Sequence, residues 1–208
     1  MDHCQKTERY NINYDSKRRF ISYWHQIHEA ILKRPKNILE VGIGNGFVSD
    51  YLKKYGIKLT TLDINKELRP DYVASVVKMP FNDNVFELVM ACEVLEHLPY
   101  RQFMSGLKEI HRVCSNWAII SLPDATRAFR VEFPIPKIGK FKRLFVIPSL
   151  QPAAHKMGEE KHYWEIGKRH YPLRRIQKDI QNAGFIIERT YRVFENPYHR
   201  FFILKKHQ

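Results

Sequence analysis

The sequence predicts one α/β domain across its 208 residues, with a mostly parallel sheet covered by helices on both faces. Short apolar runs typical of buried strands alternate along the chain with stretches of helical periodicity. This alternation requires parallel strands joined by right-handed crossovers. The chain is also long enough to bury roughly 70% of its unfolded surface in a single core.

The first expected helix spans 15–34, where apolar residues recur at helical spacing until Pro35 ends the pattern. It makes up most of an N-terminal segment, residues 1–36. Pro172 begins a later helix that runs to Ala183, and Gly184 ends it. The other expected elements are strand 37–41, helix 46–55, strand 58–63, a helical turn near 66–69, strands 72–77 and 86–91, helix 100–113, strand 116–122 and an antiparallel pair at 185–193 and 200–205.

A long insertion, 124–171, separates the strand at 116–122 from the helix after Pro172. It leaves the sheet at the carboxyl end of a parallel strand, which is where open α/β folds bind ligands. Connections longer than about 15 residues are usually functional or disordered, and the apolar content of this one argues against disorder. We interpret the insertion as a cap over the ligand site; a structural flap or a dimer contact is the alternative. The apolar residues are Phe129, Phe133, Phe141, Leu144, Phe145, Val146, Ile147, Tyr163 and Trp164.

A glycine-rich turn follows the first strand, in the sequence N-I-L-E-V-G-I-G-N-G-F. Gly42, Gly44 and Gly46 allow the backbone to reverse sharply and to present bare N–H groups at the start of a helix. The next strand, 58–63, ends in Asp63 beside this turn, where a carboxylate can accept hydrogen bonds from a ribose diol. The pattern indicates an adenosine-containing cofactor.

Two cofactors of that kind compete, a nicotinamide dinucleotide and S-adenosylmethionine. The dinucleotide fingerprint places the third glycine three positions after the second, whereas Gly46 follows Gly44 by two. Glu40 also lies near the place that a pyrophosphate would occupy. A carboxylate repels a pyrophosphate and attracts the amino group and sulfonium of S-adenosylmethionine, so spacing and charge both favour the methyl donor.

Four linked motifs resemble the class I S-adenosylmethionine-dependent methyltransferases, in particular the type 11 branch. They are L-E-V-G-I-G-N-G, T-L-D-I, M-P-F-N-D-N-V-F-E-L-V and C-E-V-L-E-H-L, and together they cover about 37–123. The resemblance implies a Rossmann-like sheet of seven strands in the order 3-2-1-4-5-7-6, with the last-numbered strand antiparallel. It also implies an enzyme that uses S-adenosylmethionine.

The resemblance assigns cofactor contacts to particular positions. In this family an acid often holds the adenine amino group, but Ser75 stands at that position, which leaves its side chain or the Val76 backbone as the contact. Cys92 either borders the sulfonium or is a small core residue. The implied contacts are Glu40, Gly42, Gly44 and Gly46 for the methionine part, Asp63 for the ribose, Ile64, Ser75 and Val76 for the adenine, and Ala91 and Cys92 beside the amino group and sulfonium.

His97, His162 and Glu165 are the candidate catalytic groups, because a base near the sulfonium can remove the acceptor's proton. Each also has an ordinary structural interpretation, and proximity and orientation can supply most of the rate without a base. His155, His162 and His170 lack the close pairing of a helical metal site, so we expect no catalytic metal.

The chain carries 35 Lys and Arg against 22 Asp and Glu, a net charge of +13. Segment 37–123 is nearly neutral, so the excess surrounds the expected acceptor side, including Lys140, Lys142 and Arg143. We therefore expect an anionic acceptor, small or lipid-like; a solvated basic face is the alternative. The run after the fourth strand lacks the Asn/Asp-Pro-Pro-aromatic motif of base-amine methyltransferases. RNA remains a possible partner, either as acceptor or for a binding module that keeps the fold.

Aromatic residues near the N-terminus are expected to include at least one that lines the acceptor pocket. The sequence contains no run of about 18 apolar residues, so no transmembrane segment is expected. The polar N-terminus is unlike a signal peptide. A soluble cytoplasmic protein is therefore expected. Three cysteines without a C-x-x-C pair indicate neither a disulfide framework nor a cysteine zinc site. The aromatic residues are Tyr10, Tyr14, Tyr23 and Trp24.

Overall fold

The structure is a computed structural model that describes residue 10 and residues 14–137, 139–147, 150–157 and 161–207. Within this part of the chain, the main sheet has seven strands in the order β3-β2-β1-β4-β5-β9-β8. The pairs formed by β1 to β5 are parallel, and β9 is antiparallel to both β5 and β8. The strands are β1 (Asn37–Val41), β2 (Lys58–Asp63), β3 (Tyr72–Val73), β4 (Phe86–Cys92), β5 (Cys114–Pro123), β8 (Phe185–Arg192) and β9 (His199–Lys206).

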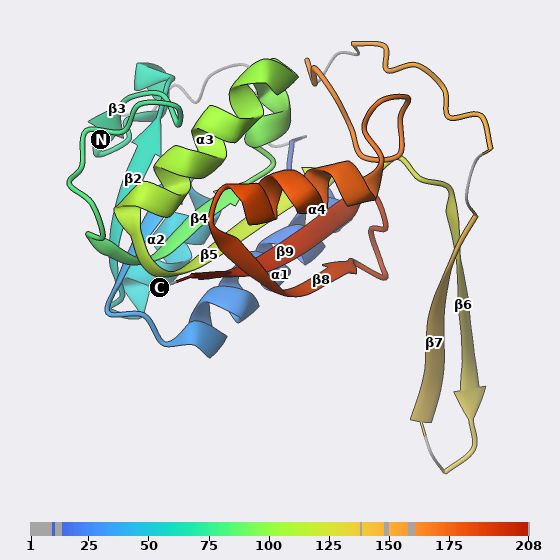
Figure 1. The fold of residues 1–208 in the computed structure, drawn as a ribbon. Coiled ribbons are helices and arrows are strands. Elements are labelled where there is room, and N and C mark those ends of the chain that lie inside the picture. Colours follow the sequence, from blue (N-terminus) through green and yellow to red (C-terminus); the bar gives the residue numbers. More distant parts are fainter. Residues whose placement is uncertain (1–9, 11–13, 138, 148–149, 158–160, 208) are drawn as a thin grey trace.

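Helices cover both faces of this sheet (Figure 1). Helices α1 (Lys17–Lys33) and α2 (Phe47–Lys54) lie on one face, and α3 (Tyr100–Val113) and α4 (Leu173–Asn182) lie on the other. The core side of α3 is fully buried at every third or fourth position, with Leu107 and Ile110 at 0% exposure. Each such side chain contributes roughly 1.5–3 kcal/mol to folding. The predicted Rossmann-like architecture is confirmed, because the predicted and observed strand orders differ only in how the strands are numbered.

Two predicted elements near the cofactor side are shorter than expected. The helical turn near 66–69 is the 3-10 helix η2 (Lys66–Leu68), and the strand expected over 72–77 is limited to β3. The chain leaves the sheet edge after Val73 because Ser75 and Lys78 pair with each other in a local turn. That turn carries Ser75 and Val76 toward the carboxyl ends of β1 and β2.

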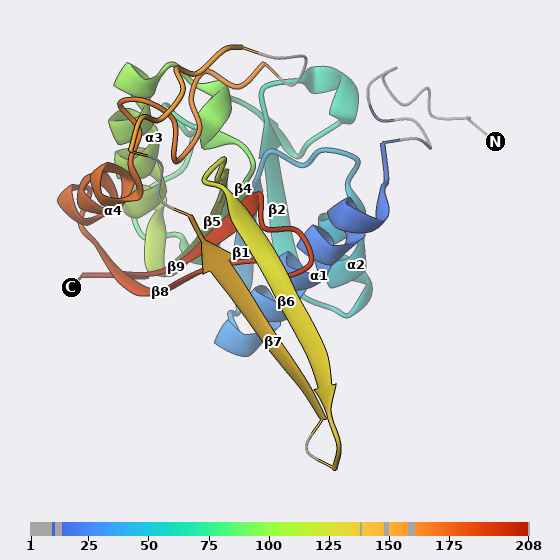
Figure 2. The same ribbon diagram turned by 90° about the vertical axis from the view of Figure 1, so that its right-hand side faces the viewer.

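The insertion contains a hairpin that the sequence analysis did not anticipate. Strands β6 (Ala128–Ile135) and β7 (Gly139–Val146) pair antiparallel in a separate sheet. The hairpin projects away from the seven-stranded sheet in both views (Figures 1 and 2). Its phenylalanines stack in cross-strand pairs, Phe129 on Phe145 and Phe133 on Phe141. Pro134 is tolerated within β6 because both strands of a two-stranded sheet are edge strands.

The second half of the insertion returns to the main core. Trp164 is completely buried, and its indole N–H donates to the backbone oxygen of Leu98 at 3.1 Å. Ile166 is also buried, and its N–H donates to the backbone oxygen of Pro123 at 3.0 Å. These contacts fix the chain around 162–166 against the carboxyl ends of β4 and β5. Among the described residues, no helix combines the length and apolar character that crossing a bilayer requires.

Candidate active site

The glycine turn connects β1 to α2 with three glycines of positive φ, as the sequence predicts. Gly42 has φ 77°, and a Cβ added there would lie 2.3 Å from Cγ2 of Val94. Gly44 has φ 56°, and a Cβ there would point into open space, with Tyr10 nearest at 3.8 Å. Gly42 is thus required by close packing against the loop after β4, and Gly44 by backbone conformation at an open surface.

Asp63 ends β2 beside this turn and fixes its shape. One carboxylate oxygen accepts from the Ile43 N–H at 3.0 Å, and the other accepts from the Asn65 N–H at 2.8 Å. A carboxylate oxygen has lone pairs for more than one donor, so Asp63 remains able to accept from ligand hydroxyls. The same side chain therefore shapes the turn and presents acceptors beside it.

Glu40 lies at the end of β1 and is only 5% exposed. Its Oε2 is buried and has no hydrogen-bond partner among the residues that the structure describes. Burial raises the pKa of this carboxyl from its ordinary 4.5 to about 8. A buried carboxyl oxygen without a donor is costly, and a cationic ligand group placed beside it would satisfy it.

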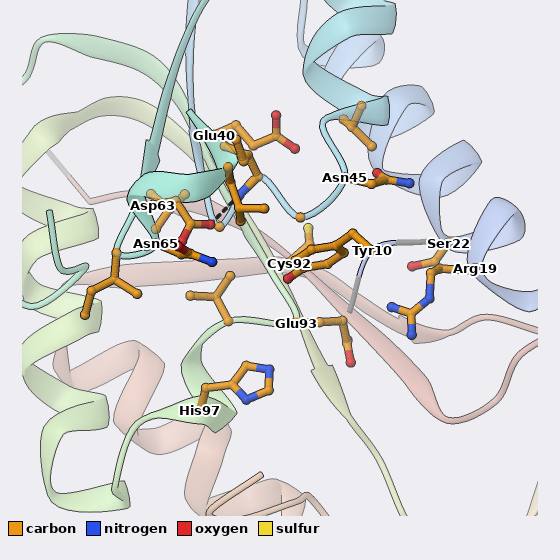
Figure 3. A pocket seen from close by; sticks show the side chains of 18 of the residues that line it. Tyr10, Arg19, Ser22, Glu40, Asn45, Asp63, Asn65, Cys92, Glu93 and His97 are labelled. Atoms are coloured by element: carbon orange, nitrogen blue, oxygen red, sulfur yellow. Dashed lines mark hydrogen bonds between the residues drawn. The ribbon is translucent and has the colours of Figure 1, made fainter. Parts of the chain in front are cut away.

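A cavity of about 810 Å³ opens beside these residues, toward the carboxyl ends of the parallel strands. This volume lies in the upper part of the usual range for small-molecule sites, about 300–1,000 Å³. Figure 3 shows Glu40 and Asp63 on one side of the pocket and Glu93 and His97 on the other. Of the predicted cofactor contacts, the following line the cavity: Glu40, Gly42, Gly44, Asp63, Ile64, Ser75, Val76 and Cys92.

The two remaining predicted contacts, Gly46 and Ala91, are not among the residues that line the cavity. Gly46 caps the N-terminus of α2, and Ala91 is fully buried within β4. Cys92, the next residue, lines the cavity, and burial raises the pKa of its thiol, which keeps it neutral. Gly46 and Ala91 are each close in sequence to residues that line the cavity. Their assignment as cofactor contacts stays a prediction.

Helix α1 and the residues before it form another wall. Tyr10, Tyr14 and Tyr23 line the cavity, whereas Trp24 is 57% exposed and stacks on His28. Arg19 also lines the cavity (Figure 3), and it donates to the backbone oxygen and the hydroxyl of Tyr14. Three of the four predicted aromatic residues therefore lie where an acceptor could contact them.

His97 and His162 are far apart in the sequence but lie next to each other in the cavity lining. Their ring centroids lie 5.0 Å apart, and both side chains line the cavity. His97 ends the 3-10 helix η3 (Leu95–His97), which follows β4, and His162 belongs to the insertion. Glu165 lies behind His162, with 3.3 Å between its Oε1 and His162 Nδ1.

Glu165 also accepts a hydrogen bond of 2.6 Å from the Tyr198 hydroxyl. Burial opposes ionisation of Glu165, but the hydrogen bonds from His162 and Tyr198 outweigh it and hold the pKa below its usual range. Glu165 is therefore a carboxylate at neutral pH and orients His162. Its predicted catalytic role, like those of His97 and His162, stays a prediction.

Several cavity residues carried no recognisable signal in the sequence. Asn45, within the glycine turn, donates to both carboxylate oxygens of Asp15 at 2.8 and 2.9 Å and so connects the turn to the start of α1. Glu93 and His199 face each other, with 3.7 Å between Oε2 and Nε2. Tyr198 ends the turn between β8 and β9, and His199 begins β9. Their placement depends on how the ends of the sheet pack, which local sequence patterns do not report.

A family model described as "Methyltransferase domain", type 11, matches residues 39–121. This segment runs from β1 to β5 and includes the glycine turn and Asp63. An uncharacterized protein from Methanocaldococcus jannaschii, MJ0638, is 32% identical over 88 residues. That match covers 39% of this chain and 38% of the archaeal protein, so the chain matches well under half the length of this curated relative.

Solved structures match over most of the chain. The PH0226 protein from Pyrococcus horikoshii has a TM-score of 0.63 at 16% identity and covers 95% of both chains. The 1,6-didemethyltoxoflavin-N1-methyltransferase from Burkholderia thailandensis, solved with bound 1,6-didemethyltoxoflavin and S-adenosylhomocysteine, has a TM-score of 0.61 at 13% identity. That match covers 95% of this chain and 82% of the other. At these identities the likeness shows a shared fold.

The chain has the Rossmann-like fold of the solved methyltransferases, with a cavity that includes the glycine turn and Asp63. Residues 39–121, less than half of the chain, match the type 11 methyltransferase domain model, and this agrees with the resemblance of the four sequence motifs. The matched domain and the fold support S-adenosylmethionine as the cofactor, a molecule that supplies an electrophilic methyl group on a sulfonium. The site fits this cofactor, because Glu40 offers a buried oxygen to a cation and Gly44 leaves space at the turn.

Proposed function

We propose that this protein transfers a methyl group from S-adenosylmethionine to a small or amphiphilic, anionic acceptor bound in the same cavity. One observation carries the proposal: a single cavity extends from Glu40 and Asp63 to His97, His162 and the aromatic residues of the N-terminal segment. The first group of residues suits the cofactor. The second group lies on the opposite side and leaves room for a second molecule near the sulfonium.

The cofactor's position follows from charge and hydrogen bonding. Glu40 would hold the cationic amino group, and Asp63 would accept from the ribose hydroxyls. The adenine would lie between Ile64, which is 75% exposed at the cavity, and the turn at Ser75 and Val76. The sulfonium would then face the side of the cavity that Glu93 and His97 form.

Cationic side chains support an anionic acceptor. Arg18, Arg19 and Lys161 line the cavity on the side of α1 and the insertion. A guanidinium in a partly enclosed site attracts carboxylate or phosphate groups strongly. Tyr10 and Tyr14 offer ring faces and hydroxyls beside Arg19, which suits an acceptor with both apolar and charged parts.

The experiment that tests this function is a methyl-transfer screen with radiolabelled S-adenosylmethionine. Metabolite, lipid and RNA pools are offered separately to the wild-type protein and to Glu40→Gln as a matched variant. Label should enter the metabolite or lipid pool with the wild type and fall sharply with the variant. Label in no pool, together with no cofactor binding in calorimetry, would refute the proposal.

RNA is the second candidate acceptor, and the hairpin is the observation that favours it. Phe129, Phe133 and Phe145 are each more than 40% exposed on its strands, and aromatic rings between basic residues suit single-stranded nucleic acid. Ion pairs make the hairpin less suited to bind RNA, because Lys140 contacts Glu132 at 3.5 Å and Lys142 contacts Glu195 at 3.1 Å.

Charge reversal at the hairpin separates the two acceptors. Lys140, Lys142 and Arg143 are all changed to Glu, with S-adenosylmethionine affinity as the control because the hairpin projects away from the sheet (Figure 2). An RNA substrate should lose most of its affinity and its steep salt dependence. A small anionic acceptor should be methylated more slowly at low salt only. Full turnover at low salt would assign the basic stretch to the solvated surface.

A further inference from the structure

A carboxylate and two imidazoles gather at the acceptor side of the cavity. Glu96, His97 and His162 each present one ligand atom, and these three atoms all lie within 4.8 Å of one another. Oε1 of Glu96 lies 4.0 Å from Nε2 of His162. Glu96 and His162 are buried, and His97 is partly exposed at the cavity.

The backbone around these residues is held by direct contacts between η3 and the insertion. The N–H of Tyr163 donates to the backbone oxygen of Glu96 at 2.8 Å. The fully buried Trp164 packs against Phe103 of α3 with a centroid distance of 4.8 Å and donates to Leu98. These contacts of Tyr163 and Trp164 hold the neighbouring His162 close to η3, at the end of β4.

A second layer of hydrogen bonds orients His162. A carboxylate oxygen only accepts, so His162 Nδ1 carries the proton that it shares with Glu165 at 3.3 Å. An ion would bind through the lone pair of Nε2, the nitrogen on the side of Glu96. Imidazoles that bind metals are commonly fixed in this way, with the far nitrogen donating to a carboxylate. Tyr198 supports the arrangement through its 2.6 Å hydrogen bond to Glu165.

We propose that Glu96, His97 and His162 form a site for one divalent transition-metal ion within the cofactor cavity. Two imidazole nitrogens and one carboxylate favour Zn²⁺, Co²⁺, Fe²⁺ or Mn²⁺ over Mg²⁺ and Ca²⁺, which prefer oxygen ligands. Metal–ligand distances of about 2.0–2.2 Å limit two ligands of one ion to about 4.4 Å apart. Three ligands in a tetrahedral arrangement lie only about 3.3–3.6 Å apart, so the three side chains would have to approach one another by roughly 0.5–1.5 Å to close the site. This proposal replaces the expectation of no catalytic metal.

The site deepens the proposed methyl transfer and rests on it for its substrate class. Three protein ligands leave coordination positions open, and the cavity lies on that side of the site. An acceptor hydroxyl bound there would lose its proton to solvent more easily, because the ion lowers its pKa. Its oxygen would form a bond to the methyl carbon while the carbon–sulfur bond breaks and leaves its electron pair on sulfur. The products are a methyl ether and S-adenosylhomocysteine, whose sulfur is a neutral thioether.

Metal binding is tested first without cofactor or acceptor. Chelator-treated protein is titrated with Co²⁺, followed by calorimetry and visible absorption, and with Mn²⁺, followed by electron paramagnetic resonance. We expect one ion per chain. Glu96→Gln and His162→Ala should each weaken binding at least about 100-fold, and Glu165→Gln about 10–100-fold. His170→Ala is the matched control, since this exposed insertion histidine lies outside the cluster.

Circular dichroism of every variant confirms that it is folded, and Glu96→Gln is the decisive one because it keeps the side chain's size. The proposal is overturned if the wild type binds neither ion, or if Glu96→Gln binds both as well as the wild type. A methyl-transfer assay then compares chelated and metal-loaded enzyme; equal turnover would exclude the role at the acceptor. If metal binds but no pool is methylated, the proposed function fails while the metal site stands.

Discussion

Cofactor binding is expected to displace a proton from Glu40. The buried carboxyl has a pKa of about 8 because it lacks a hydrated environment, so at pH 7 about 90% of it is protonated. A cationic amino group beside Oε2 favours the carboxylate and lowers that pKa. Binding below pH 8 must therefore release close to one proton, and affinity for S-adenosylmethionine should rise up to about tenfold per pH unit in this range.

The Glu40→Gln variant removes this proton without changing the size of the side chain. Its affinity should be close to that of the wild type near pH 5.5 and fall increasingly below it toward pH 7.5. At the upper end the difference should reach about 1.5–3 kcal/mol, the usual contribution of a hydrogen bond to a charged group. Other ionisable groups in the cavity titrate in both proteins, so the difference between the two isolates Glu40.

Calorimetry in two buffers with different ionisation enthalpies counts the released protons at each pH. The range from pH 5.5 to 7.5 keeps the ligand's amino group mostly protonated, since such groups titrate near 7.7–8.0. Equal proton release by the wild type and Glu40→Gln would refute this assignment of Glu40.

The same shift sets the sign of a stability effect in the free protein. Between pH 4.5 and about 8 the unfolded chain has lost this proton while the folded chain keeps it. The free energy of unfolding therefore falls as pH rises through this window, by at most about 1.4 kcal/mol per unit from this group. Urea unfolding should show a weaker pH dependence in Glu40→Gln, and parallel curves would contradict this.

Three further substitutions test the packing and hydrogen bonds around the site. Gly42→Ala should destabilise the fold by about 2–5 kcal/mol, because its Cβ meets Val94 at 2.3 Å and φ is positive; adding Val94→Ala should recover about 1–3 kcal/mol in urea unfolding, and strict additivity would count against the contact. Asp63→Ala should weaken S-adenosylmethionine binding by about 1.5–3 kcal/mol in calorimetry, while unchanged affinity would place the ribose elsewhere. Asp124→Ala should lower the free energy of unfolding by about 3–5 kcal/mol in thermal or urea unfolding. The reason is that the mostly buried Arg200 guanidinium, now 2.7 Å from the Asp124 carboxylate, would lose its partner. A loss below about 1 kcal/mol would show that solvent reaches the site.

The sheet could be predicted because its strands are buried on both faces and therefore read as short apolar runs. The glycine turn and Asp63 could be predicted because each acts within one local motif. Strand β3 was predicted too long, since Val76 and Val77 resemble strand residues but serve a turn that packs on the core.

The hairpin was missed although β6 alternates apolar and polar residues in a period of two. The sequence analysis interpreted the whole insertion as a cap and assigned no strands within it, and an isolated hairpin buries too little to leave a core pattern. The cluster of Glu96, His97 and His162 could not be predicted either, because it joins segments distant in sequence. Only the path of the insertion, fixed by Trp164, brings those segments together.

The position of β9 has a consequence for biosynthesis. This strand is made after β5 and β8 yet lies between them. Until residues 199–206 have been synthesised, β5 keeps an unpaired edge and β8 has no neighbour in the sheet. Unpaired edges of this kind promote association with other chains. The cavity, lined in part by Tyr198 and by His199 at the start of β9, is therefore complete only after this last strand has inserted.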